Sequence, residues 1–200
     1  MEDYRLITAF EKSPVIQVHH ALGGRGKQED RYLITSLENG LLLVIADGHS
    51  GGKVASFVAN NTAALFTQER ERIIRKTDLR FTKGAHPAIE RKVIKNTISK
   101  LIELTCSETS GSTITLAFIQ YLERQSDYKK IVRCHVGQMG DSVFAMSKRP
   151  GSVATMPIHS VKTNIKDVEK IRKLYEEETG NICRVNGNYI FSGIQGSGIA

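Results

Sequence analysis

Residues 41–46 form an uninterrupted apolar run, Leu-Leu-Leu-Val-Ile-Ala, and this run constrains the fold more than any other segment. A strand with water on one face alternates apolar and polar residues, because successive side chains point to opposite faces. The run does not alternate, so we expect a central strand that is covered on both faces. It is far shorter than the roughly 20 residues that a membrane-spanning helix needs. The chain is therefore expected to build its core around this strand.

A turn directly before this run joins it to a second strand-like segment. Residues 31–37 also have strand composition, and Glu38-Asn39-Gly40 separates the two segments. Asn-Gly between apolar runs predicts a β-hairpin, because both residues tolerate a positive φ. Further strands are predicted at residues 15–21, 111–121, 130–136, 142–146, 181–185 and 189–192.

Helical periodicity marks three other segments. Apolar residues recur at steps of three and four over residues 54–65, 89–102 and 168–175, with Glu90 on the polar side of the second helix. The charged residues 67–86 predict a short helix and a loop. Several strand pairs are joined by tight turns, which favours antiparallel sheet over a doubly wound parallel sheet. We predict an α+β fold with helices outside one or two sheets, in a single domain over residues 1–200.

The charge of the chain is positive, with 28 Lys and Arg against 21 Asp and Glu among 200 residues. Ten basic and four acidic residues fall within residues 69–100, which raises the hypothesis of a nucleic-acid binder. That hypothesis leaves the acidic motifs described below without a role. We therefore assign this stretch to the solvated faces of two helices and expect no nucleic-acid partner.

The cysteines and the N-terminus indicate the compartment. Cys106, Cys134 and Cys183 are odd in number and widely spaced, which makes neither a disulfide framework nor a CxxC metal site. We expect each to be a small buried apolar residue in a reducing cytoplasm. The N-terminus lacks the basic-then-apolar order of a secretory signal. The longest apolar run is too short to cross a bilayer, and no membrane partner is expected. The histidines show no HxxxH or HxH spacing, which argues against a zinc hydrolase.

Carboxylates stand at three strand ends. Glu29 and Asp30 precede the strand at 31–37, Asp47 follows the buried run and precedes Gly48, and Asp141 follows a glycine at another strand boundary. A carboxylate at the end of a buried strand is costly unless its charge is compensated. Carboxylates, a backbone carbonyl and water are the ligands that magnesium and manganese prefer.

These residue types predict metal-assisted phosphate hydrolysis. Two divalent ions about 3.5–4 Å apart bind phosphate and lower the pKa of a shared water, which then supplies hydroxide near neutral pH. Each motif alone is more often an ordinary turn or solvated surface. Their joint occurrence is what favours a metal site.

The order of these motifs resembles the type-2C family of metal-dependent (PPM-type) serine/threonine protein phosphatases, from about Arg25 onward. Residues 47–55, Asp-Gly-His-Ser-Gly-Gly-Lys-Val-Ala, resemble the family signature D-G-H-x-G-x-x-V-A. Residues 110–113 are similar to its S-G-S-T strand entry, residues 137–142 to its short G-D-S segment, and residues 184–187 to its R-V-N-G turn. The resemblance implies an α-β-β-α sandwich of two mainly antiparallel sheets flanked by helices.

The resemblance also implies which residues bind metal. Asp47 would bridge two divalent ions, manganese or magnesium. The carbonyl of Gly48 and the side chain of Glu29 would complete one site, with Asp30 ordering its waters. Asp141 matches a position associated with a further, weaker metal.

Two more matching residues imply the reaction. Arg25 would hold the substrate phosphate, and His49 would protonate the departing serine or threonine oxygen. The expected activity is hydrolysis of phosphoserine and phosphothreonine in phosphorylated protein substrates, by a metal-activated water and without a covalent phosphoenzyme. The enzyme is expected to be a cytoplasmic monomer.

The sequence departs from the family pattern near its C-terminus. Family members continue past R-V-N-G through S-R-A-L-G-D and later supply two more Asp ligands. Here Gly193 stands in place of the Arg, Ser197 in place of the Asp, and Ile158 in place of the Asp beside His159. No Asp follows Asp167, so one metal site lacks its other carboxylates. We expect a domain that is incomplete at the C-terminus. A catalytically weak or inactive phosphatase-like scaffold remains the alternative.

Overall fold

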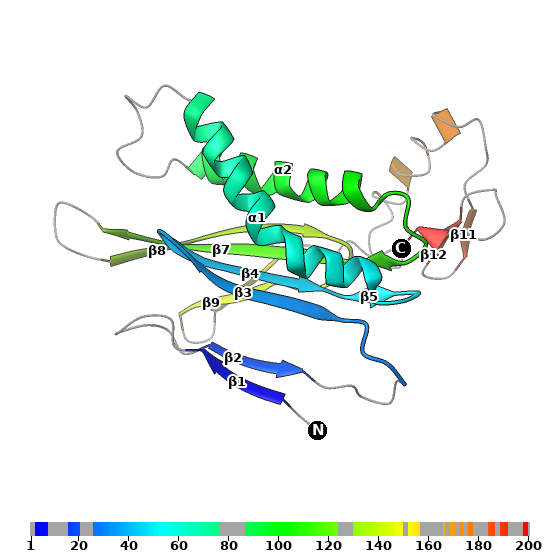
Figure 1. The fold of residues 1–200 in the computed structure, drawn as a ribbon, viewed down its shortest axis with the longest axis horizontal. Helices are drawn as coiled ribbons and strands as arrows, with labels where there is room; N and C mark the ends of the chain where they lie inside the picture. The colour runs from blue at the N-terminus through cyan, green and yellow to red at the C-terminus, as the bar shows by residue number, and fades with distance from the viewer. Residues whose placement is uncertain are drawn as a thin grey trace.

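The computed structural model describes residues 3–7, 16–20, 26–76, 87–123, 130–149 and 152–156, and, nearer the C-terminus, 166, 169–170, 173, 176–177, 184–186, 189–191 and 198–199. Its centre is a four-stranded antiparallel sheet in the order β3-β4-β7-β8 (Figure 1). These strands are β3 (Arg31–Leu37), β4 (Gly40–Ala46), β7 (Ile114–Glu123) and β8 (Lys130–Met139).

The apolar run is the second strand of this sheet, β4, with β3 on one side and β7 on the other. Leu41 and Leu42 are both buried, and adjacent side chains of a strand point to opposite faces. The predicted cover on both faces is therefore confirmed at this end of the strand. At the other end Ile45 is 52% exposed.

The hairpin between β3 and β4 is confirmed, but for a different physical reason. The pairing runs from Arg31 opposite Ala46 to Leu37 opposite Gly40. Among the described residues, a positive φ occurs at Ser50, Gly51 and Gly140, and not in this turn. Gly40 is instead required by close packing, since a Cβ there would lie 2.9 Å from the ring of Phe118 and closer still to the carbonyl oxygen of Ile119.

Two helices cover one face of the sheet (Figure 1). They are α1 (Lys53–Lys76) and α2 (Pro87–Thr105). The prediction that the first helix gives way to a short helix and a loop after residue 66 is wrong, because α1 continues to Lys76. Ile73 extends the buried stripe seven residues beyond Phe66, and the exposed pair Arg75–Glu71 (3.0 Å) supports the last turn.

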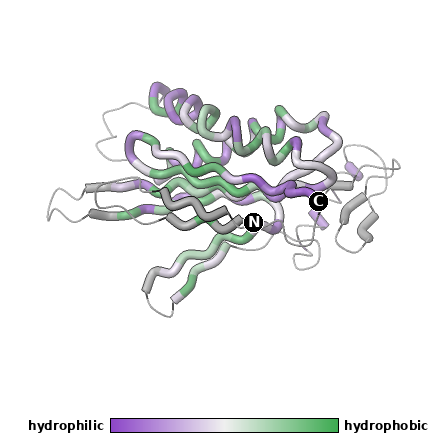
Figure 2. Tube along the Cα trace, turned by 60° about the horizontal axis from the view of Figure 1, so that its bottom comes forward, coloured by the Kyte–Doolittle hydropathy of each residue, from purple (hydrophilic) through white to green (hydrophobic). Residues whose placement is uncertain are grey.

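The core lies between the helices and the sheet. The rings of Phe66 on α1 and Phe118 on β7 have centroids 5.1 Å apart, and both side chains are fully buried. Helix α2 approaches β8 closely at Gly137, where a Cβ would overlap the side chain of Ile94. Figure 2 shows the apolar residues concentrated along the central strands and mixed with polar ones on the helices.

One charged side chain is part of this core. Glu90 is 1% exposed, although the helical pattern predicted it on the polar side of α2. One of its carboxylate oxygens, Oε1, accepts hydrogen bonds from Nε of Arg70 (3.1 Å) and Nε2 of Gln120 (3.4 Å). The buried charge is tolerated because it is paired with a cation on α1.

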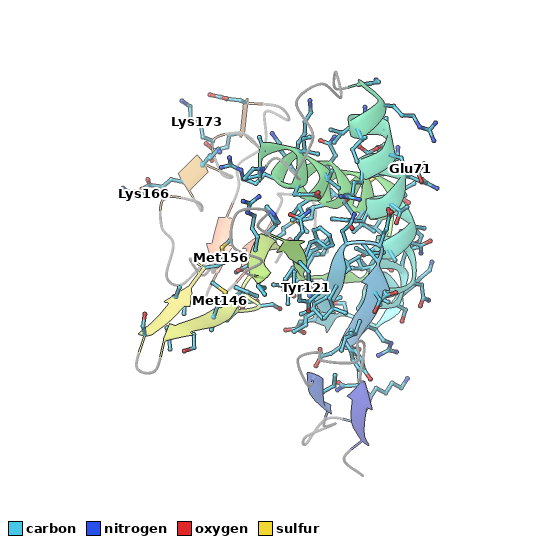
Figure 3. The ribbon with its side chains drawn as sticks, turned by 90° about the vertical axis from the view of Figure 1, so that its left-hand side faces the viewer. Glu71, Tyr121, Met146, Met156, Lys166 and Lys173 are labelled. Atoms are coloured by element: carbon cyan, nitrogen blue, oxygen red, sulfur yellow. The ribbon has the colours of Figure 1, made fainter. Side chains whose placement is uncertain are left out.

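The remaining strands form smaller antiparallel ladders. They are β1 (Asp3–Ile7) with β2 (Ile16–His20), β5 (Gly48–His49) with β6 (Gly111–Ser112), β9 (Ala145–Arg149) with β10 (Ser152–Thr155), and β11 (Arg184–Asn186) with β12 (Tyr189–Phe191) and β13 (Gly198–Ile199). Figure 1 places β1, β2 and β9 on the side of the central sheet opposite the helices. In Figure 3 the β9–β10 ladder, marked by Met146, extends away from the sheet that carries Tyr121. The α+β class with mainly antiparallel sheets and flanking helices is confirmed.

Two other expectations meet the structure in part. The described residues within 166–177 are helical, and Lys173 and Glu177 form an i,i+4 ion pair at 3.7 Å, as the predicted third helix requires. Cys106 is exposed rather than buried, Cys134 is half-buried, and Cys183 lies outside the described residues. In the described part of the chain, neither helix is long and apolar enough to cross a bilayer.

A buried histidine makes stability depend on pH. His135 is 6% exposed, and its Nε2 has no hydrogen-bond partner among the described residues. Burial, together with the positive charges of Arg133 and Arg91, lowers its pKa below the ordinary value of 6.5. The unfolded chain therefore takes up a proton as the pH falls below about 6.5, while the folded chain holds a neutral imidazole.

We expect the free energy of unfolding to fall as the pH drops from 7 through the lowered pKa of His135, and the His135→Asn variant to lose that part of the pH dependence. Urea unfolding of both chains between pH 5 and 7.5 measures this. Parallel curves for the two chains would contradict it.

Candidate functional site

One end of the central sheet gathers the predicted acidic segments. Here the outermost strand pairs are Arg31 with Ala46, Ile45 with Thr115, and Ile114 with Met139. One residue beyond these strand ends come Asp30, Asp47, Thr113 and Gly140, the last followed by Asp141. Asp30 precedes β3 and Asp47 follows β4, which is its neighbour in the sheet, and Asp141 follows β8, two strands further along. Neighbouring strands lie about 4.8 Å apart.

The main chain of Asp47 is held by Thr113. The Thr113 N–H donates to the Asp47 carbonyl at 2.9 Å, and the Asp47 N–H donates to Oγ1 of Thr113 at 3.2 Å. The same hydroxyl lies 2.5 Å from Oγ of Ser142. Asp47, Thr113 and the turn that carries Asp141 therefore form one hydrogen-bonded unit across β4, β7 and β8.

The segment that carries Glu29 and Asp30 packs on two glycines of the 47–55 signature. A Cβ at Gly48 would lie 2.5 Å from the carbonyl oxygen of Glu29, and one at Gly52 would lie 3.4 Å from its Cα. The backbone of Glu29 therefore lies against Gly48, directly after Asp47. This contact brings the backbone of Glu29 next to Gly48, which directly follows Asp47, and the sharing of one metal site by their side chains stays a prediction.

The imidazole of His49 lies over a glycine of the neighbouring strand. His49 on β5 pairs with Gly111 on β6, and a Cβ at Gly111 would overlap Nε2 of His49. Ser50 and Gly51 follow with φ angles of 59° and 112°, which turn the chain from β5 into α1. The sequence motif at 110–113 therefore contributes a surface on which the ring of His49 rests.

Arg31 is a residue of this region that sequence reasoning missed. Its Nη1 donates to the carbonyl oxygens of Gln28 at 2.8 Å and Asp30 at 2.7 Å. The sequence offered one signal, a cation directly after two carboxylates at the start of a strand. That signal does not show which oxygens the guanidinium contacts.

The donor chemistry of this end of the sheet fits a hard cation. The carboxylates of Glu29 and Asp47 and the carbonyl of Gly48 are oxygen donors of the kind that magnesium and manganese prefer. Within the described ranges, no group of three or more His, Cys, Asp and Glu side chains lies close enough to hold a metal ion. An ion here would therefore need backbone carbonyls and water among its ligands. The binuclear centre stays a prediction.

Several predicted residues cannot be placed. Arg25 lies outside the described residues, and so do His159 and the departures at Ile158, Gly193 and Ser197. Asp141 is exposed, on the turn that Ser142 joins to Thr113.

Comparison with known proteins identifies the fold but not the family. No model of a known protein family matches the chain, and no curated protein sequence matches it. A serine-threonine phosphatase 2C from Toxoplasma gondii superposes with a TM-score of 0.59 at 14% identity, covering 95% of this chain and 63% of that one. A phosphatase from a pathogenic strain of Toxoplasma gondii gives 0.54 at 14% identity, covering 84% and 58%.

A third solved structure, a sex-determining protein from Caenorhabditis elegans, gives a TM-score of 0.55 at 19% identity and covers 88% of this chain and 40% of that one. The chain thus spans between 40% and 63% of the length of these three structures. At such low identities the likeness establishes a shared fold. The α+β architecture described above is therefore the phosphatase 2C-like fold.

Replacing Thr113 by valine tests the hydrogen-bonded unit at Asp47. Thr113→Val keeps the size of the side chain but leaves the Asp47 N–H without its acceptor and the Ser142 hydroxyl without its partner. We expect the free energy of unfolding to fall by about 1–3 kcal/mol in urea titrations. The control is Thr109→Val, at an exposed threonine of the preceding loop. Equal losses in the two variants would contradict the assigned role of Thr113.

Proposed function

We propose that this chain is a metal-dependent phosphatase that hydrolyses phosphoserine and phosphothreonine in protein substrates. The observation that carries the proposal is the fold shared with a serine-threonine phosphatase 2C over 95% of this chain. A second support is the set of oxygen donors at one end of the sheet, where the backbone of Glu29 packs against Gly48, next to Asp47.

Glu29, Asp47 and the carbonyl of Gly48 would hold a manganese or magnesium ion, with Asp30 ordering its waters and Asp141 contributing to a weaker site. The chemistry that such an ion supplies is a water with a pKa near neutral and a positive charge against phosphate oxygens. The main-chain bonds of Asp47 to Thr113 keep its carboxylate at the end of β4.

Arg25 and His49 would act on the substrate. The guanidinium of Arg25 would bind the phosphate oxygens and orient the ester. The oxygen of the attacking water would form the new bond to phosphorus as the bond to the serine or threonine oxygen breaks, and that water would release its proton to the solvent. His49 would donate a proton to that oxygen, so that the product leaves as a neutral alcohol. The contact of His49 with Gly111 would keep its ring from rotating freely during this transfer.

Phosphate release from a phosphopeptide, with and without added manganese, tests the proposed function on the 200-residue chain. We expect manganese-dependent turnover that falls at least about 100-fold in Asp47→Asn, since even residues behind metal ligands cost 10–100-fold when replaced. The control is Glu71→Gln, at an exposed carboxylate of α1 (Figure 3), which should leave turnover unchanged.

Turnover that persists without manganese, or that is equal in Asp47→Asn, would contradict the proposal. Calorimetric titration with manganese distinguishes the proposed enzyme from the remaining alternative, a scaffold without catalytic activity. A chain that binds no manganese and releases no phosphate would be a phosphatase-like scaffold with the same fold.

A further inference from the structure

Arg31 holds the segment that carries Glu29 and Asp30 by its backbone. One guanidinium nitrogen, Nη1, donates to the carbonyl oxygens of Gln28 (2.8 Å) and Asp30 (2.7 Å), which lie on either side of Glu29. The side chain is half-buried, so these bonds are partly shielded from water. A single side chain therefore closes residues 28–31 into a compact turn at the start of β3.

The guanidinium contacts carbonyl oxygens although two carboxylates are its immediate neighbours. The planar guanidinium matches a carboxylate well, and the pairs that it forms with carboxylates are frequently bidentate. In the described part of the chain, neither the Glu29 nor the Asp30 side chain has a hydrogen-bond or ion-pair partner. Both carboxylates thus keep their oxygens available to another cation.

The same turn is held on its other side by β5 and by the loop before α1. The backbone of Glu29 lies against Gly48 and Gly52, and a Cβ at Gly52 would lie 3.4 Å from Nη2 of Arg31. The pairing of Arg31 with Ala46 ties its own backbone to the end of β4, one residue before Asp47. Arg31 thus connects the turn, the end of β4 and the loop before α1.

We infer that Arg31 is a positioning residue for a divalent-cation site formed by Glu29 and Asp47. It fixes the backbone of residues 28–30 through its carbonyls and leaves the carboxylates of Glu29 and Asp30 free for the ion. The inference rests on the proposed function, since it concerns the same site, and it adds a residue that the 47–55 signature does not contain.

The direction in which metal affinity changes when Arg31 is replaced separates a positioning role from a purely electrostatic one. A positive charge beside a cation site repels the ion, so removing Arg31 would tighten metal binding if charge alone mattered. If Arg31 positions the ligands, removing it would weaken binding, because the turn that carries Glu29 and Asp30 loses two hydrogen bonds. Second-layer residues of metal sites typically change affinity by about 10–100-fold when replaced.

The experiment is a calorimetric titration of manganese into the 200-residue chain and into Arg31→Met, Arg31→Lys and Arg72→Met. We expect at least a tenfold weaker affinity in Arg31→Met and a smaller loss in Arg31→Lys, which keeps the charge but not the planar donor group. Arg72→Met is the matched control, because Arg72 pairs with Glu69 on the exposed side of α1 and should leave affinity unchanged. Unchanged or tighter binding in Arg31→Met overturns the inference, and so does full recovery in Arg31→Lys.

Hydrogen exchange on the metal-free chain gives a readout that does not depend on the ion. We expect backbone amides of residues 26–31 to exchange several-fold faster in Arg31→Met than in the native chain, with Arg72→Met unchanged. If the native chain binds no manganese, the proposed metal site is rejected, and the exchange result alone decides the role of Arg31. Equal exchange in the native chain and both Arg31 variants then overturns that role.

Discussion

The paired hydrogen bonds between Asp47 and Thr113 are the constraint on which the candidate site depends. They join the end of the buried strand β4 to the start of β7, and the Thr113 hydroxyl extends the connection to Ser142 beyond β8. Without these hydrogen bonds, the backbone of Asp47 beyond the end of β4 would not be fixed in direction. Because the N–H and the carbonyl on either side of the Asp47 Cα are both held, the backbone sets the direction in which the Asp47 side chain leaves the sheet.

Much of the fold follows from short-range patterns. The unbroken apolar run of β4 indicated a central strand, and steps of three and four located the starts of both helices. The patterns failed where distant residues decide the outcome. Glu90 is buried because Arg70, twenty positions earlier on another helix, supplies a compensating charge. Gly40 is required by the approach of Phe118 from a strand almost eighty residues later.

The candidate site was predictable as a set of residue types but not as an arrangement. The order of the motifs predicted one site from Glu29, Asp30, Asp47 and Asp141. Strand register brings the backbones of these residues to one end of the sheet. Register also decides that Thr113 stands beside Asp47, which no local pattern reveals. Arg31 escaped prediction because its partners are carbonyl oxygens, which every residue carries and which leave no mark in a sequence.

Two groups of charged residues in this chain differ in how their charges are compensated. Between the helices and the sheet, Glu90 accepts hydrogen bonds from Arg70 and Gln120, so its charge is compensated within the protein. At the end of the sheet, Arg31 contacts carbonyl oxygens, and among the described residues Glu29 and Asp30 receive no such compensation. A carboxylate that is held without a counter-charge keeps its attraction for a cation from solvent. A divalent ion would therefore be attracted more to Glu29 and Asp30, for which the described residues provide no counter-charge, than to Glu90, whose charge Arg70 balances.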